Sequence, residues 1–478
     1  MTGPVSRAES ETSRHRRPSQ VEELARFVCR SRWEEISEPA REQLKLRVLD
    51  SLGVALGALD GVPVAMVREQ VQEFGGAPLA TLIGAGKSAP DRAALYNGAL
   101  VRYLDFNDSY LAPGETCHPS DNLAPVLAAC EYAHADGRTL LTALAVAYQV
   151  QNRLSEVAPV RAKGFDHTTQ GAFAVAAGVA RALGLDEQRT ANAIAIAGTS
   201  LNALRVTRTG ELSHWKGLAY PATAFAATHA AFLAMRGVTG PREVFEGYKG
   251  FIDTISGPFE IDWSREDLES VRRTILKRYN AEIHSQSAIE ALLELRSEHD
   301  LTAAAVERIE LDTFQVAYDI IGGGEEGAKY EVRSKEEADH SLPYLLAVAL
   351  LDGQVLPEQY APERLAANDV QELLRRVEVR PDPELSRRFP AQHSARVRLH
   401  LADGRTLERE QHDYEGFHTR PMGWDAVVAK FERLAASQVK ASVQARIQGT
   451  VSNLDELRVE DLTDLLVAPV TSGERRTG

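Results

Sequence analysis

Long alanine-rich segments that are apolar on most faces dominate the first half of this chain. Four of them are TLLTALAVAYQVQNRL, GAFAVAAGVARALGL, TANAIAIAGTSLNAL and YPATAFAATHAAFLAMRG. A helix that is apolar all round must be covered by other helices, and small side chains let helices approach closely. Gly184 and Gly237 lie where two of these helices should end. The pattern predicts an all-α domain, because no strand-like alternation interrupts it from Gln20 to about Ile252.

The pattern changes near Gly257. VERIELDT predicts a strand, and SARVRLHLADGRTLERE alternates around an Asp403-Gly404 turn that is typical of a β-hairpin. Helical stretches lie between them, and PMGWDAVVAKFERLAASQ is helical again. We expect this last helix to return to the first domain.

The predicted fold is therefore mainly α. It comprises a large all-α helical domain and a second, smaller α+β domain. The boundaries are residues 20–257 plus 413–468 for the discontinuous helical domain, 258–412 for the α+β domain, and 1–19 and 469–478 for disordered tails.

Composition narrows the class of protein. A chain of 478 residues is too long for one small core. Its net charge of −14, without a long basic run, argues against nucleic acid or an anionic membrane as the main partner. The first twenty residues lack the apolar core of a signal peptide. No apolar run approaches the roughly 18 residues of a membrane span, so we expect a cytoplasmic protein. The three cysteines lack metal-ligand spacing, and a zinc ribbon or cysteine-ligated iron–sulfur cluster is not expected.

One polar stretch, YLDFNDSYLAPGETCHPSDN, directly follows an apolar helical pattern. It contains Asp105, Asn107, Asp108, Ser109, Glu115, His118 and Asp121. Such a loop places carboxylates and an imidazole at the rim of a packed body, where burial and neighbouring charges can shift pKa values. A solvated loop beside a helix cap is the alternative for each residue taken alone.

Further polar clusters lie at predicted helix ends. His167 precedes a helix in KGFDHTTQGAFAV. Arg208 and Lys216 flank a glycine turn in TRTGELSHWKGLAYPA, and paired cations suit a carboxylate or phosphate. In RSKEEADHSLPYLL, a cap by Ser341 alone explains the pattern, so His340 is interpreted as structural.

The segment LKRYNAEIHSQSAIEALL is the most crowded helix start. Its hydrogen-bonding groups are Lys277, Tyr279, Glu282, His284 and Gln286. These are more than capping requires. Together the clusters offer histidines and carboxylates for proton transfer, and lysines and an arginine for binding anions. A substrate that bears carboxylates and gains or loses a proton beside one of them needs such a set.

On these motifs the chain resembles the 2-methylcitrate dehydratase / cis-aconitate decarboxylase (MmgE/PrpD) family over roughly residues 20–465. The matching segments are RVLDSLGVALGAL, YLDFNDSY with ETCHPSDN, GFDHTTQGAF, TRTGELSHWKG, KRYNAEIHSQSAIEA and EEADHSLPYLLAVALLDG. The last two look closer to the dehydratase branch. The resemblance implies a helical domain with a smaller α+β lid, an active site in the cleft between them, a homodimer, and no metal or organic cofactor.

Carried over to this chain, the resemblance also implies a set of site residues. The catalytic candidates are Asp105, His118, His167, Lys216, His284 and Tyr330; the substrate-binding candidates are Ser109, Arg208, Lys277 and Gln286. The expected reaction is elimination of water from a 2-hydroxy polycarboxylate of the 2-methylcitrate type. His118 or His167 would remove a proton, and Asp105, His284 or Tyr330 would protonate the departing hydroxyl. Lys216, Lys277 and Arg208 would hold the carboxylates.

Three other functions are compatible with the sequence. Within the same family, the enzyme could be a decarboxylase or epimerase of a related polycarboxylate, of the cis-aconitate or iminodisuccinate type. A metal-dependent hydrolase could use Asp105, Asp108, His118 and His167. A catalytically silent member would only bind acids or a partner.

Overall fold

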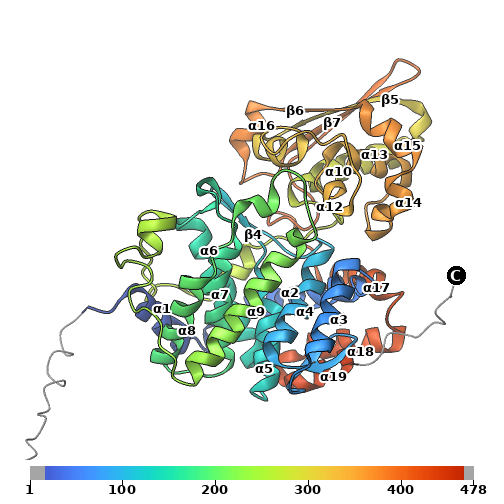
Figure 1. Ribbon diagram of the computed structural model, residues 1–478. Coiled ribbons are helices and arrows are strands. Elements are labelled where there is room, and N and C mark those ends of the chain that lie inside the picture. Colours follow the sequence, from blue (N-terminus) through green and yellow to red (C-terminus); the bar gives the residue numbers. More distant parts are fainter. Residues whose placement is uncertain (1–16, 468–478) are drawn as a thin grey trace, which may run out of the picture.

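The computed structural model describes residues 17–467 and contains two large hydrophobic cores. The first core uses buried residues from 21 to 276 and from 422 to 466, and the second uses residues from 281 to 401. Figure 1 shows the helical part below and the sheet-containing part above it. The predicted tails lie outside the described residues except for 17–19, where the Ser19 N–H donates to the Glu22 carboxylate at the start of the first helix.

The prediction of a mainly α chain is confirmed. The first part contains α1 (Gln20–Arg30), α2 (Glu38–Gly57), α3 (Val62–Phe74), α4 (Pro90–Tyr103), α5 (Leu123–Tyr132), α6 (Gly137–Val157), α7 (Thr168–Ala182), α8 (Glu187–Ser200) and α9 (Trp215–Met235). The chain returns to the same core with α17 (Trp424–Ala435), α18 (Ala441–Ser452) and α19 (Val459–Val467). Gly184 and Gly237 follow the ends of α7 and α9 with positive φ, as predicted.

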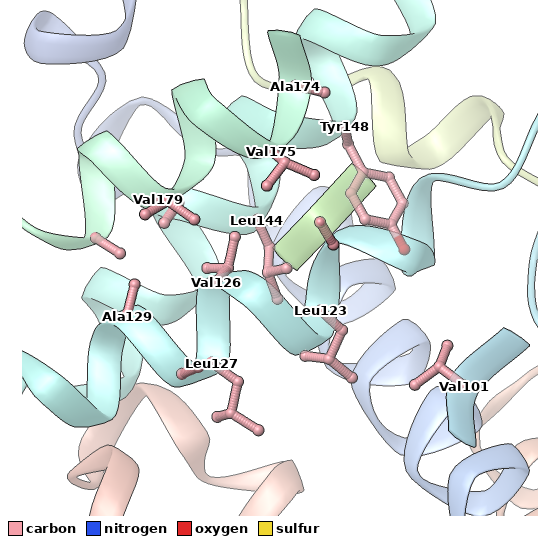
Figure 2. Packing of buried hydrophobic residues seen from close by; sticks show 14 of the residues in the cluster. Val101, Leu123, Val126, Leu127, Ala129, Leu144, Tyr148, Ala174, Val175 and Val179 are labelled. Carbon is pink, nitrogen blue, oxygen red and sulfur yellow. The ribbon is translucent and has the colours of Figure 1, made fainter. Parts of the chain in front are cut away.

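Close helix packing builds the first core. Figure 2 shows side chains of α5, α6 and α7 meeting there, among them Val126, Ala129, Leu144, Val175 and Val179. Gly171 of α7 lies so close to α9 that an added Cβ would stand 2.5 Å from the Tyr220 ring. The absence of a side chain at Gly171 lets α7 approach α9, and His167 at the start of α7 stacks against Tyr220 with 6.2 Å between ring centroids.

Two short hairpins interrupt the helical part, and the expectation of a domain without strands is wrong in this respect. β1 (Ala80–Leu82) pairs with β2 (Gly86–Ser88), and β3 (Tyr110–Ala112) pairs with β4 (Glu115–Cys117). Strands of three residues are too short to produce a recognisable alternation. The second hairpin nevertheless matters, because it sets the path of the chain between Asp105 and His118.

The second part is built on a four-stranded sheet with the order β6-β5-β7-β8. Its strands are β5 (Val306–Thr313), β6 (Val377–Pro381), β7 (Ala395–Leu401) and β8 (Thr406–Gln411). β6 is parallel to β5, whereas β7 is antiparallel to β5 and to β8. The predicted strand and the predicted hairpin at Asp403-Gly404 are both confirmed.

Helices α10 (Gln286–Glu298) and α13 (Leu342–Asp352) pack against this sheet and complete the second core. Short helices fill the connections: α11 (Gln315–Ala317), α12 (Lys335–Ala338), α14 (Pro362–Leu365), α15 (Asn368–Leu373) and α16 (Pro383–Arg388). α12 and the start of α13 bring a polar segment down to the helical part (Figure 1).

The chain passes twice between the two parts, and the two crossing segments are hydrogen-bonded to each other. The Leu276 N–H donates to the Gly416 carbonyl at 3.0 Å. Gly416 has φ 121°, and a Cβ there would stand 2.3 Å from the Leu276 oxygen, so only glycine allows this contact. The first crossing also exchanges two backbone hydrogen bonds between Ile275 and Ser109. The crossing segments therefore fix the position of Lys277 beside the Asp105 loop.

One helix of the described chain, α9, is long and apolar enough to cross a membrane by length and composition alone. The expectation that no apolar run approaches that length is therefore wrong. α9 packs against α4, α7 and α8, however, and more than half of its apolar window is buried inside the protein. Its composition is that of a central core helix.

Candidate active site

A small cavity of about 50 Å³ lies where the two parts meet. Residues of both parts line it: Arg102, Asp105, Glu115, Thr116, His118, Arg161, His167, Arg205, Arg208, Lys277, Glu282, His284, Ile320, Glu326 and His340. His118, His167 and His284 thus face one cavity although 166 positions separate the first from the last. Lys216 does not line the cavity but lies directly behind its wall, in contact with the lining residues Asp105 and His340.

Asp105 is the electrostatic centre of the site. It follows α4 with φ 55°, a left-handed conformation that is costly for a residue other than glycine. Its carboxylate lies 2.6 Å from Arg102 Nη1, 2.7 Å from Lys277 Nζ and 3.4 Å from Lys216 Nζ. Burial alone would raise the pKa of Asp105, but these cations hold it well below its usual range. Asp105 therefore stays ionised and organises cations, and its expected role as proton donor does not fit this arrangement.

A second group surrounds the Lys216 ammonium at the start of α9. Lys216 Nζ donates to Asp339 Oδ1 at 2.7 Å and lies 2.9 Å from His340 Nδ1, which is 2.6 Å from the same carboxylate oxygen. Burial lowers the pKa of Lys216, although the nearby carboxylates of Asp339 and Asp105 act to raise it. Burial and the Lys216 charge lower the pKa of His340 to about 4. Ammonium, imidazole and carboxylate are thus in direct contact, and a proton can pass between them.

His118 has a defined tautomer. Its Nδ1 lies 2.8 Å from the Asp108 carbonyl oxygen, which can only accept a hydrogen bond, so Nδ1 carries the proton. Nε2 then holds the lone pair. Burial and the Arg102 and Lys277 charges keep the pKa of His118 well below its usual range. At neutral pH the ring is an uncharged base on the cavity wall.

His167 lies beside His118, with 5.4 Å between the ring centroids and an edge-on arrangement. Its Nδ1 is 3.3 Å from Asp166 Oδ1, and its buried Nε2 has no hydrogen-bond partner among the described residues. Asp166 also accepts a hydrogen bond from Arg208 Nε at 2.7 Å. Burial and the nearby arginines, partly offset by Asp166, lower the pKa of His167 to about 3.

His284 lies on the side of the cavity formed by the second part. Phe314, Phe389 and His393 surround its ring, and neither ring nitrogen has a hydrogen-bond partner among the described residues. Burial, with the Arg161 charge, lowers the pKa of His284 to about 3. A buried imidazole on a cavity wall whose ring nitrogens make no hydrogen bond to the described residues can accept one from a ligand there.

A larger depression of about 640 Å³ adjoins the cavity. Five residues line both: Glu115, Thr116, Arg161, Arg205 and Glu326. Glu326 Oε1 accepts hydrogen bonds from Arg161 Nη2 at 3.0 Å and from Arg205 Nη2 at 2.7 Å. This ion-paired group separates the small cavity from the depression.

Four predicted site residues do not line the cavity: Lys216, described above, and Ser109, Gln286 and Tyr330. Ser109 Oγ lies 3.1 Å from His118 Nδ1, so it adjoins the histidine rather than the cavity. The Gln286 side chain accepts from the N–H groups of Arg278 and Tyr279 and shapes the loop that carries Lys277. The Tyr330 hydroxyl donates to the Val377 carbonyl in the second part. Tyr330 therefore packs against the second core and does not lie beside the histidines of the cavity.

Other lining residues were missed or misinterpreted from the sequence. Ser341 caps α13 as predicted, by accepting from the Tyr344 N–H. His340 nonetheless lines the cavity, so its interpretation as structural was incomplete. Arg102, Arg161, Arg205 and Glu326 carried no usable signal, because each lies in an ordinary amphipathic or polar segment.

The four residues of the metal-hydrolase alternative do not converge as a group. The Asp108 carboxylate accepts from the Ser120 N–H and the Tyr148 hydroxyl, at 2.9 Å each, away from the other three. Among the described residues, Asp105, Asp339 and His340 have ligand-type atoms within 4.8 Å of one another. The Lys216 ammonium already supplies positive charge among these atoms.

Neutral imidazoles beside paired cations, in a cavity between two packed parts, define a site that binds a small polyanion and moves its protons. The MmgE/PrpD N-terminal domain model matches residues 22–264, and the MmgE/PrpD C-terminal domain model matches residues 279–456. The chain belongs to the MmgE/PrpD family. The C-terminal match includes α17 and α18, which pack in the first core.

Several curated relatives are similar over most of the chain. The alkylcitrate dehydratase phiI of a fungal species is 29% identical over 425 residues, which cover 81% of each chain. The 2-methylcitrate dehydratase of Cupriavidus necator is 30% identical over 78% of this chain and 80% of its own. That of Escherichia coli K12 is 28% identical over the same shares.

Proposed function

We propose that this protein is a hydro-lyase that eliminates water from a 2-hydroxy polycarboxylate of the 2-methylcitrate type without a metal or organic cofactor. The observation that carries the proposal is the meeting of His118, His167 and His284 with Arg102 and Lys277 in one cavity. The names of the relatives support the same reaction.

In this proposal His118 is the base. Its Nε2 lone pair takes the proton from the carbon beside a carboxylate, and the electron pair left behind forms the carbon–carbon double bond as the carbon–oxygen bond breaks. The Nδ1–H group keeps its hydrogen bond to the Asp108 carbonyl, and this hydrogen bond stabilises the imidazolium that forms. A positioned base of this kind contributes about 10²–10⁴-fold in rate.

The Lys216–His340–Asp339 group supplies the proton to the departing hydroxyl, which leaves as water. His340 lines the cavity and relays the proton: as its ring gives one proton to the hydroxyl, it takes one from the Lys216 ammonium, and Lys216 is reprotonated from water after the product leaves. This assignment replaces Asp105 and Tyr330 as acids, because the first is held ionised and the second lies elsewhere.

The cations of the site stabilise the charge that develops on the carboxylate as the adjacent carbon loses its proton. Arg102, Lys277 and Arg208 line the cavity for this purpose. Preorganised donors aimed at developing charge are commonly worth about 3 kcal/mol each.

We also propose that the sheet-containing part serves as a lid. The cavity of about 50 Å³ holds only a few water molecules. A tricarboxylate requires more space, and His284, Ile320, Glu326 and His340 from the second part must move relative to the first part to admit it. A homodimer and a cytoplasmic location remain predictions from the resemblance and the composition.

Product analysis tests the proposed reaction. The purified protein is incubated with 2-methylcitrate, citrate and cis-aconitate after dialysis against a chelator, and products are identified by mass and by NMR. We expect loss of water from 2-methylcitrate at an undiminished rate after dialysis. Loss of carbon dioxide, or a change in optical rotation without a change in mass, would replace the hydro-lyase with a decarboxylase or an epimerase.

A further inference from the structure

We propose that Arg161 and Arg205 form a binding subsite for a substrate carboxylate, and that the Glu326 carboxylate occupies this subsite until substrate displaces it. The inference rests on the proposed function for the kind of ligand, a small polycarboxylate. It gives functions to Arg161, Arg205 and Glu326, none of which was identified from the sequence.

The position of the two arginines indicates a subsite. Arg161 and Arg205 line both the small cavity and the adjoining depression, so a ligand entering from outside meets them before the histidines. Their side chains are 22% and 16% exposed, which leaves them accessible yet partly desolvated. Guanidinium groups in such surroundings favour carboxylates strongly.

The backbones of both arginines are fixed on the helical part. The Glu115 carboxylate accepts hydrogen bonds from the backbone N–H groups of Val160 and Arg161, at 3.1 Å each. The backbone N–H of Arg205 donates to the Gly164 carbonyl, and its Nη1 lies 3.9 Å from Asp166. The helical part therefore positions both residues at the mouth of the cavity, while Glu326 joins their guanidinium groups from the other part.

Glu326 differs from the other carboxylates that line the cavity. Asp105 bonds three cations, Glu115 accepts from three backbone N–H groups, and Glu282 accepts from the His284 N–H. The hydrogen bonds of the Glu326 carboxylate go only to Arg161 and Arg205 among the described residues.

Glu326 also belongs to the other part of the molecule. It lies in a turn bounded by Gly323 and Gly327, which have φ values of 107° and 93°, and its one backbone hydrogen bond within residues 17–467 is the N–H donated to the Asp319 carbonyl. Withdrawal of this turn with the sheet-containing part would break two ion pairs and leave both arginines free for an anion.

The chemistry of the exchange is a substitution of one carboxylate for another. The substrate carboxylate farthest from the reacting carbon takes the two guanidinium groups, and Glu326 moves into the depression and water. Without substrate, Glu326 places a carboxylate between two half-buried cations that would otherwise face each other. Because Glu326 competes for the site, it lowers the apparent affinity for every ligand that uses the pair.

Calorimetric binding of propane-1,2,3-tricarboxylate, which has no hydroxyl to lose, tests the inference without turnover. Glu326→Gln should tighten binding by about tenfold, a change of about 1.4 kcal/mol. The matched control is Glu325→Gln on the same turn, which removes an equal charge that pairs with neither arginine and should leave the affinity within about twofold. Unchanged or weaker binding by folded Glu326→Gln overturns the inference.

A second variant does not depend on the folding of the first. Arg161→Gln should weaken binding of the tricarboxylate at least tenfold and leave binding of glutarate, which lacks one carboxylate, nearly unchanged. Equal losses for both ligands would show general electrostatics instead of a subsite and would overturn the inference.

The double variant Arg205→Gln/Glu326→Gln tests whether the effect of Glu326 acts through the arginines. The tighter tricarboxylate binding produced by Glu326→Gln alone should disappear in this double variant. Tighter binding that is retained would contradict the inference. Tight tricarboxylate binding without dehydration of 2-methylcitrate would refute the proposed function alone.

Discussion

Lys277 Nζ donates two hydrogen bonds to Asp105, one to its carboxylate at 2.7 Å and one to its backbone carbonyl at 2.6 Å. The lysine thus neutralises the central carboxylate and also holds the strained backbone that presents it. Both side chains are almost fully buried, so neither can exchange its partner for water.

Lys277→Met should therefore destabilise the protein and stop turnover. Removal of one partner of a buried pair costs about 3–5 kcal/mol in the free energy of unfolding, which urea titration measures. In Asp105→Asn/Lys277→Met, both charges are absent, and part of the stability should return while activity does not. The control is Lys45→Met, which breaks a pair with Asp455 outside the cavity and should leave kcat unchanged. Full activity in Lys277→Met would contradict the arrangement.

His118→Ala should lower kcat by at least about 100-fold, because the proposed base is lost while the fold is kept. Steady-state kinetics and circular dichroism check both statements. The matched control is His134→Gln, which changes an exposed histidine in the turn just after α5 and should retain the wild-type rate. A near-normal rate in His118→Ala would remove this residue from the mechanism.

Ser109→Ala should lower kcat by about three- to tenfold with little change in KM, because Ser109 contacts His118 Nδ1 and not the cavity. A substrate-binding serine would show the opposite split, with the larger effect on KM. Ser109→Thr, which keeps the hydroxyl, should restore much of the rate. A rise in KM alone would return Ser109 to its predicted role.

The acid limb of kcat/KM should lie below the pKa of an ordinary histidine. The base must be deprotonated in the free enzyme, so activity is lost as pH falls through its folded pKa. Burial and neighbouring cations place that pKa for His118 well below its usual range, and activity should persist where an ordinary histidine is already half protonated. The ionisation of free substrate is titrated separately and subtracted. A limb centred near 6.5 would indicate an unperturbed histidine.

Tyr330→Phe should keep wild-type kcat within about twofold and lose about 1 kcal/mol of stability. The change removes one hydrogen bond to the Val377 carbonyl and nothing in the cavity. Activity assays and urea unfolding of the same preparation give both numbers. A loss of turnover above tenfold would mean that Tyr330 reaches the substrate after all.

The helices could be predicted because their sequences are apolar on most faces, and α6, α7, α8 and α9 are buried accordingly. The strand at 306–313 and the hairpin at Asp403-Gly404 could be predicted because alternation extends over six or more residues. The hairpins near Leu82 and Ala112 could not, since three residues carry too little pattern.

The histidines of the site were predictable because they follow or precede apolar helices in polar turns. The ion pairs were not. Glu326 and Arg205 are 121 positions apart, and nothing in either segment indicates that they meet. His340 shows a further limit. The cap by Ser341 is present and explains the sequence pattern by itself, so the position of His340 on the cavity wall could not be predicted.

The two hydrogen-bonded crossing segments place any movement of the sheet-containing part next to the central charge. If that part moves as proposed, the backbone turns near Leu276, and the next residue in the chain is the lysine that holds Asp105. In the proposed lid movement, opening of the site and loosening of the Lys277–Asp105 ion pair would therefore occur together.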